Sequence, residues 1–172
     1  KFTNNITKSK SDNMNKYKHL SGLHTFFSIC AIVLTFEACS PKQVIMKNVV
    51  FTPSAPAPIG PYSQAIEAGG FVFVSGQIAI DPVTGNLYSG DDIQAETRVV
   101  MENLKAIITQ AGCCMKDVVK CTIFLTDMNN FAQVNTVYGE YFPEYAPARE
   151  TVAVVGLPKN VRVEISAVVV KR

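Results

Sequence analysis

Histidine is almost absent from this sequence. Its two histidines, His19 and His24, both precede residue 46, so none occurs from Met46 to Arg172. That absence excludes a Ser/His/Asp relay, a Cys/His pair and a His-ligated metal site from the part of the chain after residue 45. Acid–base chemistry there must depend on Glu, Asp, Lys, Tyr or Cys side chains.

Paired cysteine motifs are also lacking. The five cysteines form no C-x-x-C pair and leave an odd residue over, which disfavours both a disulfide framework and a zinc site. Reduced thiols are therefore expected. Adjacent Cys113 and Cys114 could form a strained vicinal disulfide. The more common explanation is that they are simply two small residues that follow the end of a helix. Neither residue is assigned any chemistry.

Positive charge is scarce after residue 45. Residues 46–172 hold ten Lys and Arg against twelve Asp and Glu, a net charge of −2, whereas residues 1–45 hold six Lys and two acids, a net charge of +4. A slightly acidic domain without a basic stripe is a poor match for the phosphate backbone of nucleic acids. We expect no nucleic-acid partner for this domain.

Residues 1–45 differ in composition from the rest and are interpreted as a leader. Residues 14–39 combine a basic start, an apolar stretch too short to span a bilayer and a small residue before Cys39, which resembles a bacterial lipoprotein signal. The alternative is that the working protein starts at Met46. Both interpretations predict that the leader is disordered or removed. The protein is then either cytoplasmic, starting at Met46, or an envelope lipoprotein anchored at Cys39, with no membrane contact by the domain itself.

Residues 46–172 have the length of one domain. Apolar periodicity predicts one helix that starts at Asp91 and stops before Gly112, and a second that is capped by Asp127 or Asn129. Alternating or β-branched segments predict six strands: residues 47–52, 65–67, 71–75, 118–125, 149–155 and 161–170. This order predicts an α+β fold, a mostly antiparallel sheet with both helices on one face.

The last predicted strand is apolar on both sides. Val161, Val163 and Ile165 alternate towards one face, while Val168 and Val170 make the other face half apolar. Since the helices can cover only one face, we expect the other to meet another subunit.

Two charged residues near the end of the chain suggest a site for a small carboxylic acid. Arg149 follows Pro147 and Ala148, and Glu164 interrupts the apolar strand. A guanidinium binds a carboxylate through two parallel hydrogen bonds. A carboxylate in partly apolar surroundings is the simplest base for activating water.

Five ordered motifs of the domain resemble the Rid family of imine deaminases (YjgF type). They are APIGPYSQA at 57–65, VSGQI at 74–78, FAQVN at 131–135, PAR at 147–149 and LPKNVRVEI at 157–165. Their order is kept without a large gap over about residues 46–172. Five ordered motifs in one small domain make the resemblance specific.

The resemblance implies a chorismate-mutase-like fold of Rid type, assembled into a homotrimer with a barrel-like centre and sites between subunits. The implied reaction is the hydrolysis of enamines and imines such as 2-aminoacrylate, 2-iminopropanoate and 2-iminobutanoate to 2-keto acids and ammonia, without metal or organic cofactor.

The resemblance also assigns roles to individual residues. Arg149 would bind the substrate carboxylate and Glu164 would position and deprotonate the attacking water. The other assigned residues line the pocket, either from the same chain (Tyr62, Ser75, Thr151) or from the neighbouring one (Asn135, Lys120).

This sequence departs from the family pattern at two of these positions. Thr151 stands where some relatives carry Cys, so thiol catalysis is not implied. Ser166 replaces a common acidic residue, which removes a like charge and is expected to lower the pKa of Glu164 relative to that pattern.

Two other functions remain open. A non-catalytic trimer could hold small carboxylates as a regulator. A trimer that acts on RNA or protein partners is the third, and the acidic domain disfavours it.

Overall fold

The computed structural model describes residues 46–171. These residues form one sheet of six strands in the order β1-β2-β3-β6-β4-β5, together with two α-helices, α2 and α3. The predicted leader and its lipoprotein signal lie outside the described residues. Among residues 46–171, no helix has the length and apolar character needed to cross a membrane.

The first half of the sheet is an antiparallel meander. Strand β1 (Asn48–Val50) pairs with β2 (Ala65–Ala68), which pairs with β3 (Phe71–Gln77). Gly69 and Gly70, between β2 and β3, have φ angles of 59° and 80°. Positive φ at both central residues is what a tight hairpin of this kind requires, so the predicted hairpin is confirmed.

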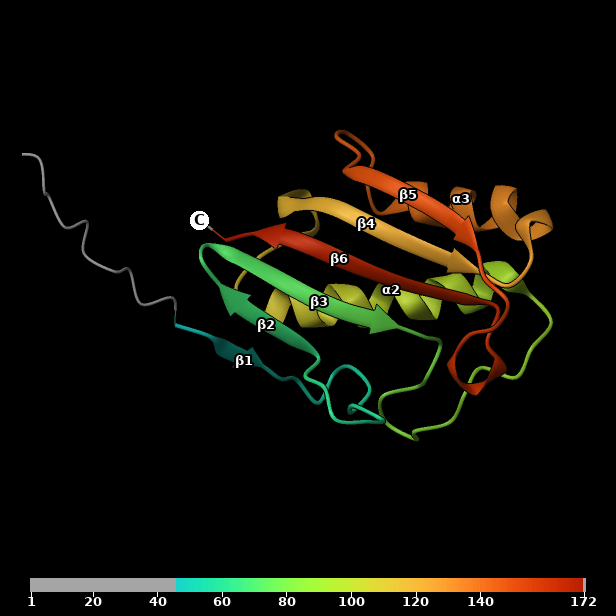
Figure 1. Cartoon of the computed structure of the whole chain (residues 1–172). Helices are drawn as coiled ribbons and strands as arrows, with labels where there is room; N and C mark the ends of the chain where they lie inside the picture. The colour runs from blue at the N-terminus through green and yellow to red at the C-terminus, as the bar shows by residue number, and fades with distance from the viewer. Residues whose placement is uncertain (1–45, 172) are drawn as a thin grey trace, which may run out of the picture. The chain divides into compact units, whose positions relative to one another are not determined.

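Strand β6 (Val163–Val170) lies between β3 and β4 (Val118–Leu125) and runs antiparallel to both. The edge strand β5 (Ala148–Ala153) pairs with β4 in the parallel direction. Helix α3 (Phe131–Glu140) connects these two parallel strands. The predicted α+β fold with a mostly antiparallel sheet is therefore confirmed (Figure 1).

Helix α2 (Ile93–Gln110) begins one residue later than predicted. The cap is Asp92, whose carboxylate accepts a hydrogen bond from the Gln94 amide at 2.8 Å. Asp91 was the wrong choice because only Asp92 stands two residues before that free amide. Asp127 does act as a cap, but of the short 3₁₀ helix Met128–Asn130, and α3 follows directly at Phe131.

Both helices cover one face of the sheet (Figure 1). The buried core lies between these layers, and its sheet side is formed by alternate residues of the central strands: Val72, Val74, Ile123, Leu125, Val163, Ile165, Ala167 and Val169. The opposite face, called the open face below, leaves Phe71, Phe73 and Val152 between 41 and 48% exposed. The structure thus has the second apolar face that the sequence predicted.

Candidate functional site

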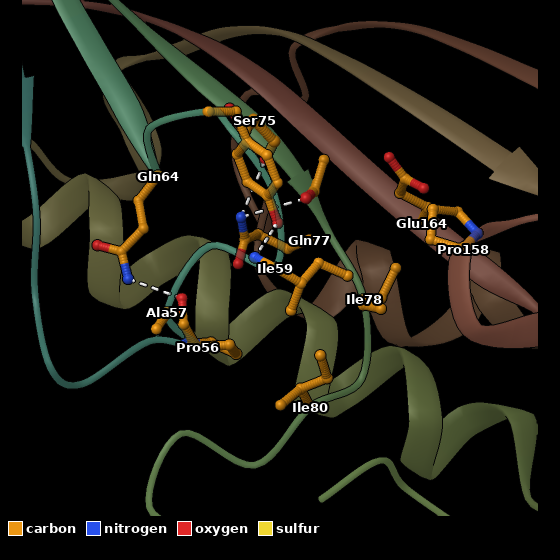
Figure 2. A pocket seen from close by; sticks show the side chains of 12 residues that line it. Pro56, Ala57, Ile59, Gln64, Ser75, Gln77, Ile78, Ile80, Pro158 and Glu164 are labelled. Atoms are coloured by element: carbon orange, nitrogen blue, oxygen red, sulfur yellow. Dashed lines mark hydrogen bonds between the residues drawn. The ribbon is translucent and has the colours of Figure 1, made fainter. Parts of the chain in front are cut away.

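A cavity of about 230 Å³ lies where the proline-rich segment after β1 passes the ends of β3 and β6. Figure 2 shows Glu164 beside Pro158, with Gln64, Ala57 and Pro56 at the other end of the pocket. Most of its wall is apolar. Its lining residues are Pro56, Ala57, Ile59, Tyr62, Gln64, Ser75, Gly76, Gln77, Ile78, Ile80, Pro158 and Glu164.

Glu164 is the ionisable group with a shifted pKa in this cavity. It is paired with Phe124 across β4 and β6, so its side chain leaves the sheet on the open face. The side chain is half-buried, and burial raises the pKa of its carboxyl above the ordinary value. A carboxylate whose charge is weakly solvated in this way is a better proton acceptor than one in water.

Gly76 makes room for this carboxylate. A Cβ at position 76 would lie 1.8 Å from the Glu164 Oε1, closer than any side chain allows. The pairing of β3 with β6 also shifts register between Val74 and Gln77. The backbone of β3 therefore bulges next to Glu164 and leaves space for its carboxylate. Such bulges are common beside functional sites.

Gln64 holds the proline-rich wall of the cavity in place. Its buried side-chain amide donates to the carbonyls of Thr52, Ala55 and Pro56 at 2.8–3.1 Å and accepts from the Thr52 amide at 2.7 Å. Proline has no backbone N–H to donate to a neighbouring strand. The side-chain hydrogen bonds of Gln64 therefore fix this proline-rich segment in place of strand-to-strand hydrogen bonds.

Tyr62 and Ser75 complete the polar part of the cavity. The Tyr62 ring is 45% exposed, and its hydroxyl accepts a hydrogen bond from the Ile59 amide at 3.2 Å. The Ser75 hydroxyl donates to the Ser63 carbonyl at 2.7 Å. Because that bond uses its proton, the hydroxyl faces a ligand as an acceptor.

Arg149 belongs to a second group of residues on the other side of the sheet. Its guanidinium donates to the Asn135 side-chain oxygen at 2.5 Å and lies over the ring of Tyr138, with 4.8 Å from Cζ to the centroid. The Phe131 ring is 5.7 Å away. Within residues 46–171, Arg149 forms no salt bridge, unlike Arg98 and Arg162.

The register explains why the two groups are apart. Arg149 pairs with Cys121, and Cys121 pairs with Ala167, so these three side chains leave the sheet on the helix side. Glu164 stands three residues before Ala167 and therefore points the opposite way. Within one chain, the sheet itself separates the guanidinium from the carboxylate.

The remaining predicted residues divide between the two groups. Thr151 pairs with Ile123 and so lies on the helix side with Arg149, and its hydroxyl is buried without a hydrogen-bond partner. Tyr62 and Ser75 lie with Glu164. Lys120 lies with neither group, because its ammonium is 3.1 Å from the Glu150 carboxylate on the open face.

Three residues that matter in this geometry were not singled out from the sequence. Gln64 and Gly76 occur inside the quoted motifs, and their motif positions were the available signal. The position of Tyr138 in the helix is that of an ordinary core-facing residue, so its spacing gave no sign that it lies beside Arg149. Within the described residues, no group of three or more His, Cys, Asp or Glu side chains is arranged to hold a metal ion.

Known proteins resemble this chain over the described domain. A profile of the family described as Endoribonuclease L-PSP matches residues 52–171. A "RutC family protein" of Pyrococcus horikoshii is 56% identical over 126 residues, which are 73% of this chain and 99% of that protein. TdcF of Escherichia coli, named as a candidate reactive intermediate deaminase, is 43% identical over 129 residues, which are 73% of this chain and 98% of that protein.

Solved structures agree with the fold. The crystal structure of a candidate endoribonuclease from Thermotoga maritima matches with a TM-score of 0.72 and 54% identity, covering 74% of this chain and 99% of that one. Escherichia coli TdcF with bound serine matches with a TM-score of 0.69 and 41% identity, covering 73% and 99%. The chain therefore belongs to the Endoribonuclease L-PSP family, the RutC and Rid proteins whose motifs its sequence carries.

Proposed function

We propose that the protein hydrolyses 2-imino acids and their enamine tautomers, such as 2-aminoacrylate, 2-iminopropanoate and 2-iminobutanoate, to 2-keto acids and ammonia. The observation that carries the proposal is the state of Arg149. Its guanidinium is exposed and held by an amide and two rings, all of them neutral, so its charge is left for a carboxylate.

The chemistry suits the residues of the two groups. Arg149 binds the substrate carboxylate, and Glu164 takes a proton from water as its oxygen attacks the iminium carbon. The new C–O bond turns C=N into a single bond. The protonated Glu164 then returns its proton to nitrogen, and as the C–N bond breaks the hydroxyl proton passes to the same carboxylate, which releases ammonia and leaves the keto acid. An iminium carbon is already electrophilic, so an oriented water and a proton carrier are enough.

The active form in this proposal is a homotrimer with sites between subunits. Arg149 and Glu164 lie on opposite sides of the sheet in one chain, so one small molecule cannot contact both there. If each site is formed by the Glu164 cavity of one copy and the Arg149 group of the next, one substrate molecule can contact both residues. The exposed aromatic residues of the open face, Phe71 and Phe73, support such an assembly.

The relatives support the substrate class. The TdcF structure contains serine, a small amino acid with the carboxylate and nitrogen substituent that an imino acid also carries. Deaminase names among the relatives point to the same chemistry.

The test measures hydrolysis of freshly generated 2-iminopropanoate and 2-iminobutanoate by the full chain. We expect a rate above the spontaneous background that falls at least about 100-fold in Arg149→Ala. Arg98→Ala is the matched control, since Arg98 is a surface arginine whose guanidinium is already paired with the Glu140 carboxylate. Carboxylate binding by calorimetry without any acceleration of hydrolysis would instead support the non-catalytic regulator.

The family description and two structural relatives carry endoribonuclease names, so ribonuclease activity is the second function to test. The excess of acidic over basic residues in positions 46–172 disfavours it. RNA cleavage that survives further purification and disappears in Arg149→Ala would favour it over deamination.

A further inference from the structure

Arg149 lies against an aromatic surface that helix α3 provides. Tyr138 is the nearer ring, with 4.8 Å from the guanidinium carbon to the centroid, and Phe131 is at 5.7 Å. Both residues are on α3, which also provides Asn135, so three side chains of one helix contact a single guanidinium. None of these three side chains carries a negative charge, so none of them forms an ion pair with Arg149.

The Tyr138 ring is itself held firmly. It is only 3% exposed, and it packs against Phe142 with the ring centroids 4.7 Å apart. Buried Val134 and Val137 flank it on the same helix. A ring that cannot move is a fixed support for whatever rests on it.

The Tyr138 hydroxyl does not explain the position of this residue. It is buried, and burial, together with the neighbouring Cys121 thiol, raises the pKa of this phenol far above its ordinary value. It is thus a neutral group that neither donates to Arg149 nor carries a charge for it. The feature that faces the guanidinium is the ring.

We propose that Tyr138 is a positioning residue, whose ring, together with Phe131, fixes the Arg149 guanidinium so that its N–H groups are presented to Asn135 and to a carboxylate ligand. A cation over an aromatic face is attracted by the ring's quadrupole. Arginine otherwise loses considerable side-chain freedom when it binds a ligand. The ring removes that freedom in advance, so a carboxylate binds more tightly.

This inference rests on the proposed function only in that Arg149 is the carboxylate anchor. Pyruvate is the probe, since it carries the carboxylate and can be studied by calorimetry without turnover. The full chain is compared with Tyr138→Leu, Tyr138→Phe and Val72→Ala. Val72 is the control because it is fully buried in the core but lies on β3, which β6 and β4 separate from the Arg149 strand β5.

We expect Tyr138→Leu to raise the pyruvate Kd, and the KM for 2-iminopropanoate, by about 2- to 30-fold, with kcat changed much less. Tyr138→Phe keeps the ring and restores both to within about two-fold of wild type. Val72→Ala lowers Tm as Tyr138→Leu does, without the increase in Kd. If Tyr138→Leu fails to fold, Phe131→Leu, which removes the outer, half-buried ring, is expected to raise Kd in the same direction.

An unchanged Kd in the folded leucine variants, or a Tyr138→Phe variant as defective as Tyr138→Leu, would overturn the proposal. Wild-type protein that binds pyruvate but does not hydrolyse imines would refute the deaminase function while leaving this comparison of Kd values intact. Wild-type protein that does neither would remove the carboxylate anchor, and the proposal with it.

Discussion

Gly76 lets the backbone of β3 lie directly against the Glu164 carboxylate, with no space for a side chain. Gly76→Ala would force that carboxylate out of its position. We expect a fall in kcat/KM of roughly 10- to 100-fold, because a displaced general base no longer reaches the water. Steady-state hydrolysis of 2-iminopropanoate gives the value.

Gly139→Ala is the control for that substitution. A Cβ at Gly139 meets nothing within 4 Å, and the residue lies inside α3. Alanine should leave activity unchanged and slightly raise Tm, since it is the better helix former. An active Gly76→Ala enzyme would show that the close packing at Glu164 has no part in catalysis.

Burial of Glu164 also gives a prediction for pH. Because its pKa is raised in the folded state, the folded protein binds a proton that the unfolded chain releases. The free energy of unfolding therefore falls as pH rises from the ordinary Glu value through the raised one. Glu164→Gln removes this loss and should make the protein more stable than wild type at pH 7, while matching wild type at pH 4, below the ordinary value of 4.5.

The same variant should lose most of its hydrolysis, roughly 100- to 10,000-fold. Urea unfolding at the two pH values and the rate of imine hydrolysis measure the two effects. A variant that is less stable at pH 7 would show that the carboxylate is held by favourable interactions and not disfavoured by burial. In that case, Glu164 would be a structural residue.

At the scale of elements, a partly buried ion pair fixes the chain that leads into β6. Glu96, in the first turn of α2, is 4% exposed, and its carboxylate accepts from the Arg162 amide at 2.9 Å and from its guanidinium at 2.6 Å. The same guanidinium donates to the carbonyls of Asp91 and Gly90 at 2.7 and 3.0 Å. The pair therefore joins the start of α2 to the residue just before β6.

Glu96→Ala should destabilise the protein by about 2–4 kcal/mol, since it leaves a half-buried guanidinium and a backbone amide without their acceptor. Urea unfolding midpoints measure the loss. Lys105→Ala, which removes a pair with Glu102 in which both side chains are half exposed, should have a much smaller effect. Equal losses in the two variants would mean that the Glu96 pair contributes no more than a surface contact.

The elements themselves were largely predictable from the sequence, because period and turn chemistry are local. Gly69 and Gly70 indicated the β2–β3 hairpin, and the apolar stripe of α2 indicated its extent to within a residue or two. The arrangement of the site was not predictable. Whether Arg149 and Glu164 share a face depends on the β4–β5 and β4–β6 registers, which follow from the packing of the whole sheet.

At the scale of the whole molecule, the separation of Arg149 from Glu164 leads to a prediction about mixed assemblies. Arg149→Ala and Glu164→Ala should each be inactive alone. If each site joins two copies, a trimer that contains both variants has interfaces where an intact Glu164 cavity meets an intact Arg149 group. Every cyclic trimer that contains both variants has one complete interface out of three, so mixed trimers of the co-expressed variants should regain about a third of wild-type activity per site.

The recovery distinguishes a shared site from one contained in a single chain. Each variant would be given a different affinity tag and the mixed species purified through both tags, so that hydrolysis is measured only on assemblies containing the two chains. Co-expression of Arg149→Ala with Gly76→Ala should restore activity as well, because both Gly76 and Glu164 belong to the cavity group. Glu164→Ala with Gly76→Ala should restore none, since both substitutions damage that same half. A mixed assembly of Arg149→Ala and Glu164→Ala that stays inactive would mean that the two groups do not meet between subunits, and the homotrimeric site would have to be abandoned.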